Sequence, residues 1–457
     1  MNKDKIEQIL NKLVSTGADF GEVFIENTIH ENFTYVDNRL DNYTINNING
    51  MGLRIALDKD VFYSAINDVN DEKINNAIDE LKKNISEDKK FEHIKLDALR
   101  KYGKKLDTKY DDKKIKEYLK KVNDLVRSKD KRVNQVEVKV AGTRQDVTIA
   151  NHTGKYVQEQ RVRSRLYITA SFKDENKSAN ITYSYGKAKS YDFLDDVDLE
   201  KEVDLLIKNG LDKLYAKDAI GGVMPVVIGN GFGGVIFHEA CGHAMEATSV
   251  ADNISVLSGK LGEEIASHVV TIIDDGRISQ EWGTTLIDDE GKETKKNILI
   301  ENGVLKNYLI DEINNRTLKM EVTGSGRRES YLYPPTSRMN NTYLAAGHDT
   351  IQNMIKSIKH GLYAAKMGGG CVSPETGDFN FACDIAYMIR DGMIAECVKS
   401  ASLIGNTKEI LKEVEMVSDN LELGPGMCGS VSGYVPVNVG MPTIKVKAIL
   451  VGGKNEE

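Results

Sequence analysis

The sequence lacks any hydrophobic run long enough to cross a bilayer. Its longest nearly apolar stretch, residues 221–229, is far shorter than the ~20 residues that a membrane helix needs. The opening residues Met1-Asn-Lys-Asp-Lys begin no apolar segment of the signal-peptide type. We therefore expect a cytoplasmic protein that has no membrane partner.

An excess of basic residues is also absent. The chain has 61 Lys and Arg against 69 Asp and Glu, a formal net charge of −8. This balance favours solubility and offers no general attraction to a phosphate backbone. Nucleic acid is therefore not an expected partner.

Proline and cysteine are scarce. The seven prolines form no proline-rich linker, so domain boundaries have to be inferred from changes of pattern along the 457 residues. The five cysteines, in a chain without an export signal, should be reduced thiols. Their expected chemistry is metal ligation or nucleophilic attack, not disulfide formation.

The first half begins with a helix and continues with strands. Residues 4–16 predict an amphipathic helix that stops near Gly17. Alternating residues then predict antiparallel strands to about residue 65, with a turn at Asn49-Gly50, followed by a helix over residues 74–85. The apolar positions of the first helix lie at helical spacing: Ile6, Ile9, Leu10 and Leu13.

The same order of elements then returns. A helix is predicted over residues 115–126, strands from residue 136 to about 185, and a second helix over residues 199–207. We interpret residues 1–217 as an α+β N-terminal domain built from two helix–antiparallel meander–helix units.

From residue 218 to 457 the sequence predicts a β-rich C-terminal domain. It is rich in glycine and has hairpin signals at Asn302-Gly303 and Asp391-Gly392. The predicted helical exceptions are residues 232–249, about 349–358, and 407–419.

The densest chemical signal begins in a glycine-rich turn and ends in His-Glu-x-x-x-His, residues 238–243. Gly229, Gly231 and Gly234 satisfy the dinucleotide pattern G-x-G-x-x-G, but position 249 is serine where a nucleotide fold needs an acidic residue. The glycines are better explained by a tight turn and a close approach to the helix start.

The spacing of the two histidines predicts an irregular helix. On a regular α-helix, residues five apart lie about 140° apart around the axis, too far for His238 and His243 to share an ion. A π-bulge, in which residues i and i+5 stack, restores the alignment, and Gly242 can absorb the irregular backbone. Two core or capping histidines are the alternative.

A zinc site with catalytic function needs a third protein ligand and one open position. The candidates are Cys428, Cys241, Glu246 and His268. Cys241 is expected to pack as a small apolar side chain, whereas Cys428 lies among small residues that leave room for an ion. Spacing alone does not decide between the candidates.

A resemblance adds to this interpretation. Residues 229–246 resemble the motif region of the TldD branch of the TldD/PmbA metalloprotease family, and further matching segments occur at 324–331, 337–342, 368–370 and 428–443. The resemblance implies zinc-dependent peptide hydrolysis. It assigns His238, His243 and Cys428 as Zn²⁺ ligands and Glu239 as the catalytic carboxylate.

The resemblance also implies partners. The PmbA or TldE branch lacks the histidine motif, so the motif here indicates the catalytic subunit of a homodimer, or of a heterodimer with a PmbA/TldE-like relative. Arg327, Arg328 and Arg338 are candidates for clamping a substrate carboxylate, with ion pairs inside the protein as the alternative.

The resulting prediction is an enzyme, a zinc-dependent peptidase that hydrolyses unfolded or extended peptides with water activated by Glu239. Its substrate would bind by adding a strand to a sheet edge inside a restricted cleft. The alternatives are a zinc amidase acting on a small non-peptide amide, and a non-catalytic peptide-binding scaffold or partner subunit.

Overall fold

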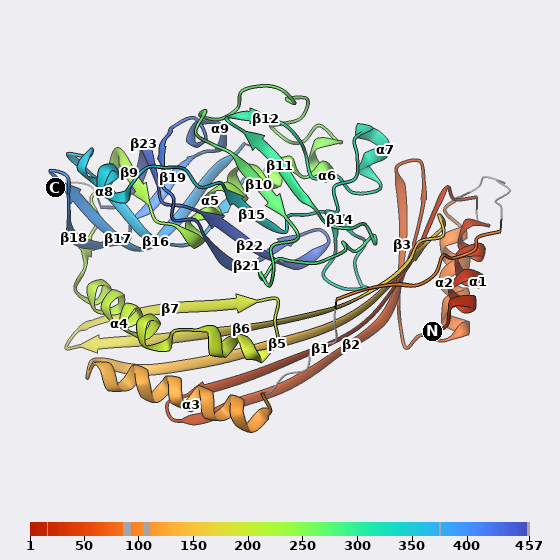
Figure 1. The fold of residues 1–457 in the computed structure, drawn as a ribbon, viewed down its shortest axis with the longest axis horizontal. Coiled ribbons are helices and arrows are strands. Elements are labelled where there is room, and N and C mark those ends of the chain that lie inside the picture. The colour runs from red at the N-terminus through yellow and green to blue at the C-terminus, as the bar shows by residue number, and fades with distance from the viewer. Residues whose placement is uncertain (16, 86–92, 104–109, 374–375, 455–457) are drawn as a thin grey trace.

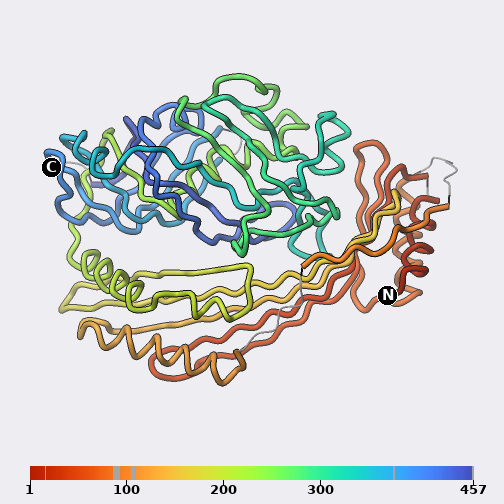
Figure 2. The backbone as a smooth tube through the Cα atoms, viewed as in Figure 1, coloured from red at the N-terminus to blue at the C-terminus, as the bar shows by residue number. Residues whose placement is uncertain are grey.

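The computed structural model describes residues 1–15, 17–85, 93–103, 110–373 and 376–454. The fold is of the predicted mixed α+β class. A long curved sheet made by the first half of the chain spans one side of the molecule, and a β-rich body made by the second half lies on the other (Figure 1). The trace from green to blue stays on one side of that sheet (Figure 2).

The four main helices of the first half begin at polar caps. In each, an Asn or Asp side chain accepts a hydrogen bond from a backbone N–H of the first turn, which satisfies a donor that the helix itself leaves free. These helices are α1 (Lys3–Val14), α2 (Asp71–Lys82), α3 (Asp112–Lys129) and α4 (Leu199–Tyr215).

The strands of the first half form one sheet in the order β3-β2-β1-β5-β6-β4, with β7 paired to β6. Antiparallel pairing of β1 with β5 joins the two halves of this sheet. The strands are β1 (Phe20–Val36), β2 (Arg39–Leu57), β3 (Asp60–Asn67), β4 (Arg100–Tyr102), β5 (Val133–Asn151), β6 (Tyr156–Asp174) and β7 (Lys177–Lys187).

The helices cover opposite ends of the sheet. Helices α1 and α2 pack with β1, β2 and β3 in one core, and α3 and α4 pack with β1, β5, β6 and β7 in another. Figure 1 shows the two pairs far apart along the curved strands. The middle of the sheet is left to face the second half of the chain.

The predicted turn at Asn49-Gly50 is wrong. Strand β2 passes straight through both residues, and the turns lie at Asp37-Asn38 and after Leu57. Gly50 has a packing role instead, because a Cβ there would lie 2.3 Å from the ring of Tyr331. The glycine admits an aromatic side chain from the second half of the chain.

The second half has two larger sheets with a core between them. Their orders are β12-β11-β10-β15-β22-β21 and β16-β9-β23-β19-β17-β18-β8, and β20 pairs with β23. The strands that build them, with the small pair β13 and β14, are β8 (Lys217–Asp218), β9 (Gly222–Ile228), β10 (Ile272–Asp275), β11 (Lys296–Glu301), β12 (Val304–Leu305), β13 (Gly326–Arg327), β14 (Thr336–Ser337), β15 (Asn341–Leu344), β16 (His360–Val372), β17 (Asp378–Arg390), β18 (Met393–Lys399), β19 (Ser402–Asn406), β20 (Val414–Val417), β21 (Glu422–Ser430), β22 (Gly433–Met441) and β23 (Ile444–Gly452).

Both hairpin signals are confirmed. Asn302-Gly303 joins β11 to β12 and Asp391-Gly392 joins β17 to β18, and all four residues have positive φ. The helix predicted over 407–419 is too long, because α9 (Thr407–Ile410) ends early and β20 follows. The other short helices are α5 (Val235–Phe237), α6 (Ala247–Val250), α7 (Asn314–Leu318) and α8 (Ile351–Lys356).

Across the described part of the chain, helices that combine the length and the apolar character needed to span a membrane are absent.

Candidate metal centre

The motif segment is a strand followed by a broken helix. After β9, the chain forms a 3-10 turn over Gly231–Gly234, the short helix α5, and a π-helix over His238–Gly242. The predicted π-type irregularity is thus confirmed. It places the imidazoles of His238 and His243 with their ring centroids 5.1 Å apart.

Two glycines in this segment allow close packing. A Cβ on Gly234 would lie 2.5 Å from the backbone of Gly440 in β22. A Cβ on Gly242 would lie 2.2 Å from the sulfur of Met339. The motif segment therefore lies directly against β22 and the chain before β15 because these two positions have no side chain.

Cys428 reaches the histidines from β21, which ends one of the two larger sheets. Its Sγ lies 3.2 Å from Nε2 of His238 and 3.3 Å from Nε2 of His243. Among the residues that the structure describes, these three form the one cluster of at least three His, Cys, Asp or Glu ligand atoms compact enough to hold a metal ion.

The environment favours the thiolate form of Cys428. Burial would raise the pKa of the thiol, but the charge and hydrogen bonds of His238 and His243 outweigh it and lower the pKa to about 3. Cys241 is different, because burial raises its pKa and its thiol donates to the carbonyl of Phe237. The surroundings of Cys428 therefore favour the thiolate form that metal ligation requires, and those of Cys241 favour the neutral thiol.

Two glutamates flank His243 on opposite sides of its ring. Glu239 is partly exposed, and its Oε2 lies 3.7 Å from Nε2 of His243, beside the ligand atoms. Glu246 is buried, and its Oε2 lies 3.0 Å from Nδ1 on the other edge of the imidazole. Glu246, a sequence candidate for the third ligand, therefore lies behind His243 and not beside Cys428.

The donor set fits a zinc ion. Tetrahedral coordination at ordinary zinc bond lengths places a nitrogen and a sulfur ligand about 3.5 Å apart. The observed nitrogen–sulfur separations of 3.2 and 3.3 Å are close to this value. Two imidazoles and one thiolate also leave a fourth position open, as in catalytic zinc sites.

The three arginines proposed for substrate binding are buried, with at most 3% of each residue exposed. Arg327 donates to the carbonyls of Met339 and Pro436, and Arg328 pairs with Glu22 at 2.6 Å. Arg338 donates to the carbonyl of Cys428. The sequence left two roles open for these arginines, clamping a substrate carboxylate and pairing inside the protein. Their contacts support the second role.

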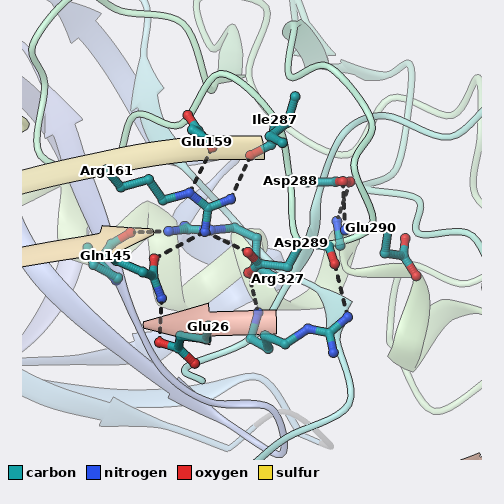
Figure 3. A network of polar contacts seen from close by, with 12 residues as sticks. Glu26, Gln145, Glu159, Arg161, Ile287, Asp288, Asp289, Glu290 and Arg327 are labelled. Carbon is teal, nitrogen blue, oxygen red and sulfur yellow. Dashed lines mark hydrogen bonds and ion pairs between the residues drawn. The ribbon is translucent and has the colours of Figure 1, made fainter. Parts of the chain in front are cut away.

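Arg328 belongs to a buried charge network that sequence reasoning missed. Arg161 lies between Glu159 and Asp289 (Figure 3), and its ion pairs with them measure 2.8 and 2.6 Å. Arg54 similarly contacts Glu22 and Glu290 at 2.6 and 2.8 Å. Arg161 and Arg54 each pair with a carboxylate of their own sheet and with one from the loop at residues 289–290, so the network joins the two halves of the chain.

The edge of the cysteine-bearing strand is partly covered. The carbonyl of Pro425 accepts from Arg165 at 2.7 Å, and the carbonyl of Gly426 accepts from the indole of Trp282 at 2.8 Å. Next to these residues lies a cavity of about 1450 Å³ between β7, α4 and β21. Its lining includes Tyr183, Tyr185, Phe232 and Gly424.

Comparison with known proteins identifies the class. Three family models match in succession: PmbA/TldA metallopeptidase domain 1 over residues 21–85, the central domain over 104–220, and the C-terminal domain over 221–453. The chain belongs to the PmbA/TldD family of metallopeptidases.

Individual relatives agree with this assignment. The chain is 30% identical to the metalloprotease TldD homolog of Buchnera aphidicola subsp. Acyrthosiphon pisum, over 99% of this chain and 96% of the relative. It is 38% identical to the TldD homolog of Haemophilus influenzae, over 75% of this chain and 73% of the relative.

Solved structures show the same fold. TldE from Thermococcus kodakarensis matches with a TM-score of 0.76 at 21% identity, covering 98% of this chain and 100% of that one. A Thermotoga maritima protein described as a putative modulator of a DNA gyrase matches with a TM-score of 0.78 at 20% identity, covering 98% and 99%.

Proposed function

We propose that the chain is a zinc-dependent peptidase that hydrolyses unfolded or extended polypeptides. The observation that carries this proposal is the convergence of two imidazole nitrogens and one cysteine sulfur beside Glu239. Membership of a metallopeptidase family supports it. A soft sulfur with two nitrogen ligands suits zinc better than the hard cations Mg²⁺ and Ca²⁺.

The proposed roles follow from the positions of the side chains. A zinc ion bound by His238, His243 and Cys428 would polarise the scissile carbonyl and acidify water. The carboxylate of Glu239 takes a proton from the attacking water and returns it to the leaving amine. The partial exposure of Glu239 supports this role, because a proton carrier has to reach the substrate.

Metal analysis combined with a degradation assay tests the proposal. We expect one zinc per chain, cleavage of an unfolded polypeptide, loss of cleavage with a chelator, and recovery when zinc is restored. Metal-free protein that still binds extended peptides would favour the scaffold alternative. Cleavage of a small amide but of no peptide would favour the amidase.

We also propose that two subunits enclose the site and admit only extended chain. The partner is a second copy or a PmbA/TldE-like relative, and a TldE protein has the same fold as this chain. Light scattering should give a dimer, and folded substrates should resist cleavage. A monomer that cleaves native and unfolded substrates equally would contradict this arrangement without touching the metal chemistry.

Substrate binding by strand addition stays a prediction. Pairing with β21 would have to avoid the carbonyls of Pro425, Gly426 and Cys428, which already accept from Arg165, Trp282 and Arg338. Little side-chain preference is expected, because such pairing uses the substrate backbone.

A further inference from the structure

A buried ion pair lies directly behind two of the proposed zinc ligands. The side chain of Glu246 is 6% exposed and that of Arg338 is fully buried. Their contacts lead to different ligands on different segments of the chain.

Glu246 contacts the ligand on the motif segment. Its Oε2 lies 3.0 Å from Nδ1 of His243, and the Nε2 of the same ring faces Sγ of Cys428. A carboxylate at Nδ1 keeps the proton on that nitrogen and leaves Nε2 with a lone pair for a metal. The contact also fixes the rotation of the ring.

Arg338 contacts the segment that carries the thiol. Its guanidinium donates to the carbonyl of Cys428 at 2.5 Å. It also donates to the hydroxyl of Ser432 at 2.8 Å and to the carbonyl of Gly433 at 2.9 Å. One side chain thus holds both strands of the β21–β22 hairpin and the turn between them.

The two side chains also face each other. Nε of Arg338 lies 3.8 Å from Oε1 of Glu246, an ion-pair distance, and both atoms are buried without a hydrogen-bond partner. The backbone of Arg338 is fixed separately by its N–H bond to the carbonyl of Ser325 at 2.8 Å. The unused donor of Arg338 and the unused acceptor of Glu246 therefore lie nearest to each other.

We infer that Glu246 and Arg338 are positioning residues that hold the ring of His243 and the strand of Cys428 in one fixed relation, so that a metal ion meets a preformed site. The inference rests on the proposed function for the identity of the ion. A set of ligands drawn from two segments needs such a link, since neither segment alone controls the distance between them.

Metal affinity tests this inference without any assay of cleavage. Zn²⁺ affinity would be measured by competition with a chelator, and coordination geometry by the visible spectrum after substitution with Co²⁺. The variants are Glu246→Gln, Glu246→Ala, Arg338→Lys, Arg338→Met and the double variant Glu246→Gln/Arg338→Met. Glu22→Gln is a matched control, because Glu22 is an equally buried partner of an arginine outside the ligand set.

We expect Glu246→Ala and Arg338→Met to weaken zinc binding about 10–100-fold, with an altered cobalt spectrum. The milder Glu246→Gln and Arg338→Lys should weaken it less, because each keeps part of the contact. The fold-loss of zinc affinity in the double variant should be smaller than the product of the two single fold-losses, because both changes disrupt the same contact between Glu246 and Arg338. The folded fraction of Glu22→Gln should bind both metals as the parent does.

Three results would overturn the inference. Zinc affinity and cobalt spectra equal to the parent in all Glu246 and Arg338 variants would refute the positioning role alone, provided that Cys428→Ala loses the metal. Independent, fully multiplicative losses would refute the coupling. A parent protein that takes up neither metal would refute the proposed zinc chemistry, and the positioning role with it. If Arg338→Met fails to fold, the zinc affinities and cobalt spectra of Glu246→Gln and Arg338→Lys still test the positioning role.

Discussion

Cys428 and Cys241 lie in the same region of the protein but in opposite chemical settings. Cys428 faces two imidazoles that favour its thiolate, whereas the thiol of Cys241 donates a hydrogen bond to a backbone carbonyl. Cys428→Ala should therefore weaken zinc binding by more than the ~10–100-fold typical of an outer partner, and Cys241→Ala should leave it unchanged. Zinc content after dialysis against a weak chelator measures both. Equal zinc in Cys428→Ala and the parent would remove Cys428 from the ligand set.

Glu239 has a different predicted role from the ligands. Glu239→Gln should lower peptide hydrolysis by at least ~10²–10⁴-fold while zinc stays bound, because the variant loses a proton carrier and keeps all three ligands. Activity and metal content have to be measured on the same preparation. Loss of zinc in this variant would make Glu239 a ligand and contradict the assignment.

For individual residues, the sequence predicted the candidate metal ligands better than the side chains that contact those ligands. The spacing of His238 and His243 was enough to require a π-helix, which the structure contains. Spacing alone left Cys428 as one of several candidates and the family resemblance selected it, and the fold brings it within 3.3 Å of both histidines. The roles of Glu246 and Arg338 were missed, because their partners are set by packing between segments and leave no local pattern.

The motif segment depends on close contact with β22. In Gly234→Ala the added methyl group would meet the backbone of Gly440, which cannot rotate away as a side chain can. We expect the free energy of unfolding to fall by ~1–3 kcal/mol, as for other overpacked sites. Gly369→Ala is the control, because a Cβ at Gly369 meets nothing within 4 Å. Equal urea midpoints for the two variants would contradict the packing role.

Local turn chemistry predicted some elements correctly and misjudged others. Asn302-Gly303 forms a hairpin, whereas Asn49-Gly50 with the same two letters lies inside β2. Gly50 is explained by its contact with the ring of Tyr331, a residue far away in sequence. Similarly, the apolar spacing over 407–419 suits a helix, but pairing of Val414–Val417 with β23 takes the chain into a sheet.

At the scale of the whole molecule, buried charges join the two halves. Burial would raise the pKa of Glu22, but Arg54 and Arg328 outweigh it and hold the pKa below its ordinary value. A lowered carboxyl pKa stabilises the fold above the pKa of the unfolded chain, and this contribution is lost as pH falls through the folded pKa.

Glu22→Gln should therefore lower the free energy of unfolding near neutral pH by ~3–5 kcal/mol, because two arginines lose a buried partner. The difference from the parent should shrink as pH falls from about 4.5, where Glu22 of the unfolded chain takes up a proton, down through the lowered pKa of the folded state. Urea unfolding at several pH values measures this. A difference that is independent of pH would contradict the ionised pair.

This network could not be predicted from sequence. Glu22, Arg161 and Asp289 each lie in ordinary strand or loop patterns, and alternation alone marks such residues as solvent-facing. Only the packing of the second half against the long sheet buries them. The α+β class could be predicted because it depends on local sequence patterns alone.

The proposed ligands also have a consequence for synthesis of the chain. His238 and His243 leave the ribosome long before Cys428, which follows His238 by 190 residues. Strand β22, whose turn residues accept from Arg338, emerges later still. A nascent chain therefore carries both histidines and Glu239 without the thiol while the 185 residues from His243 to Cys428 are added. On the proposed chemistry, its hydrolytic centre is completed only after Cys428 has been synthesised.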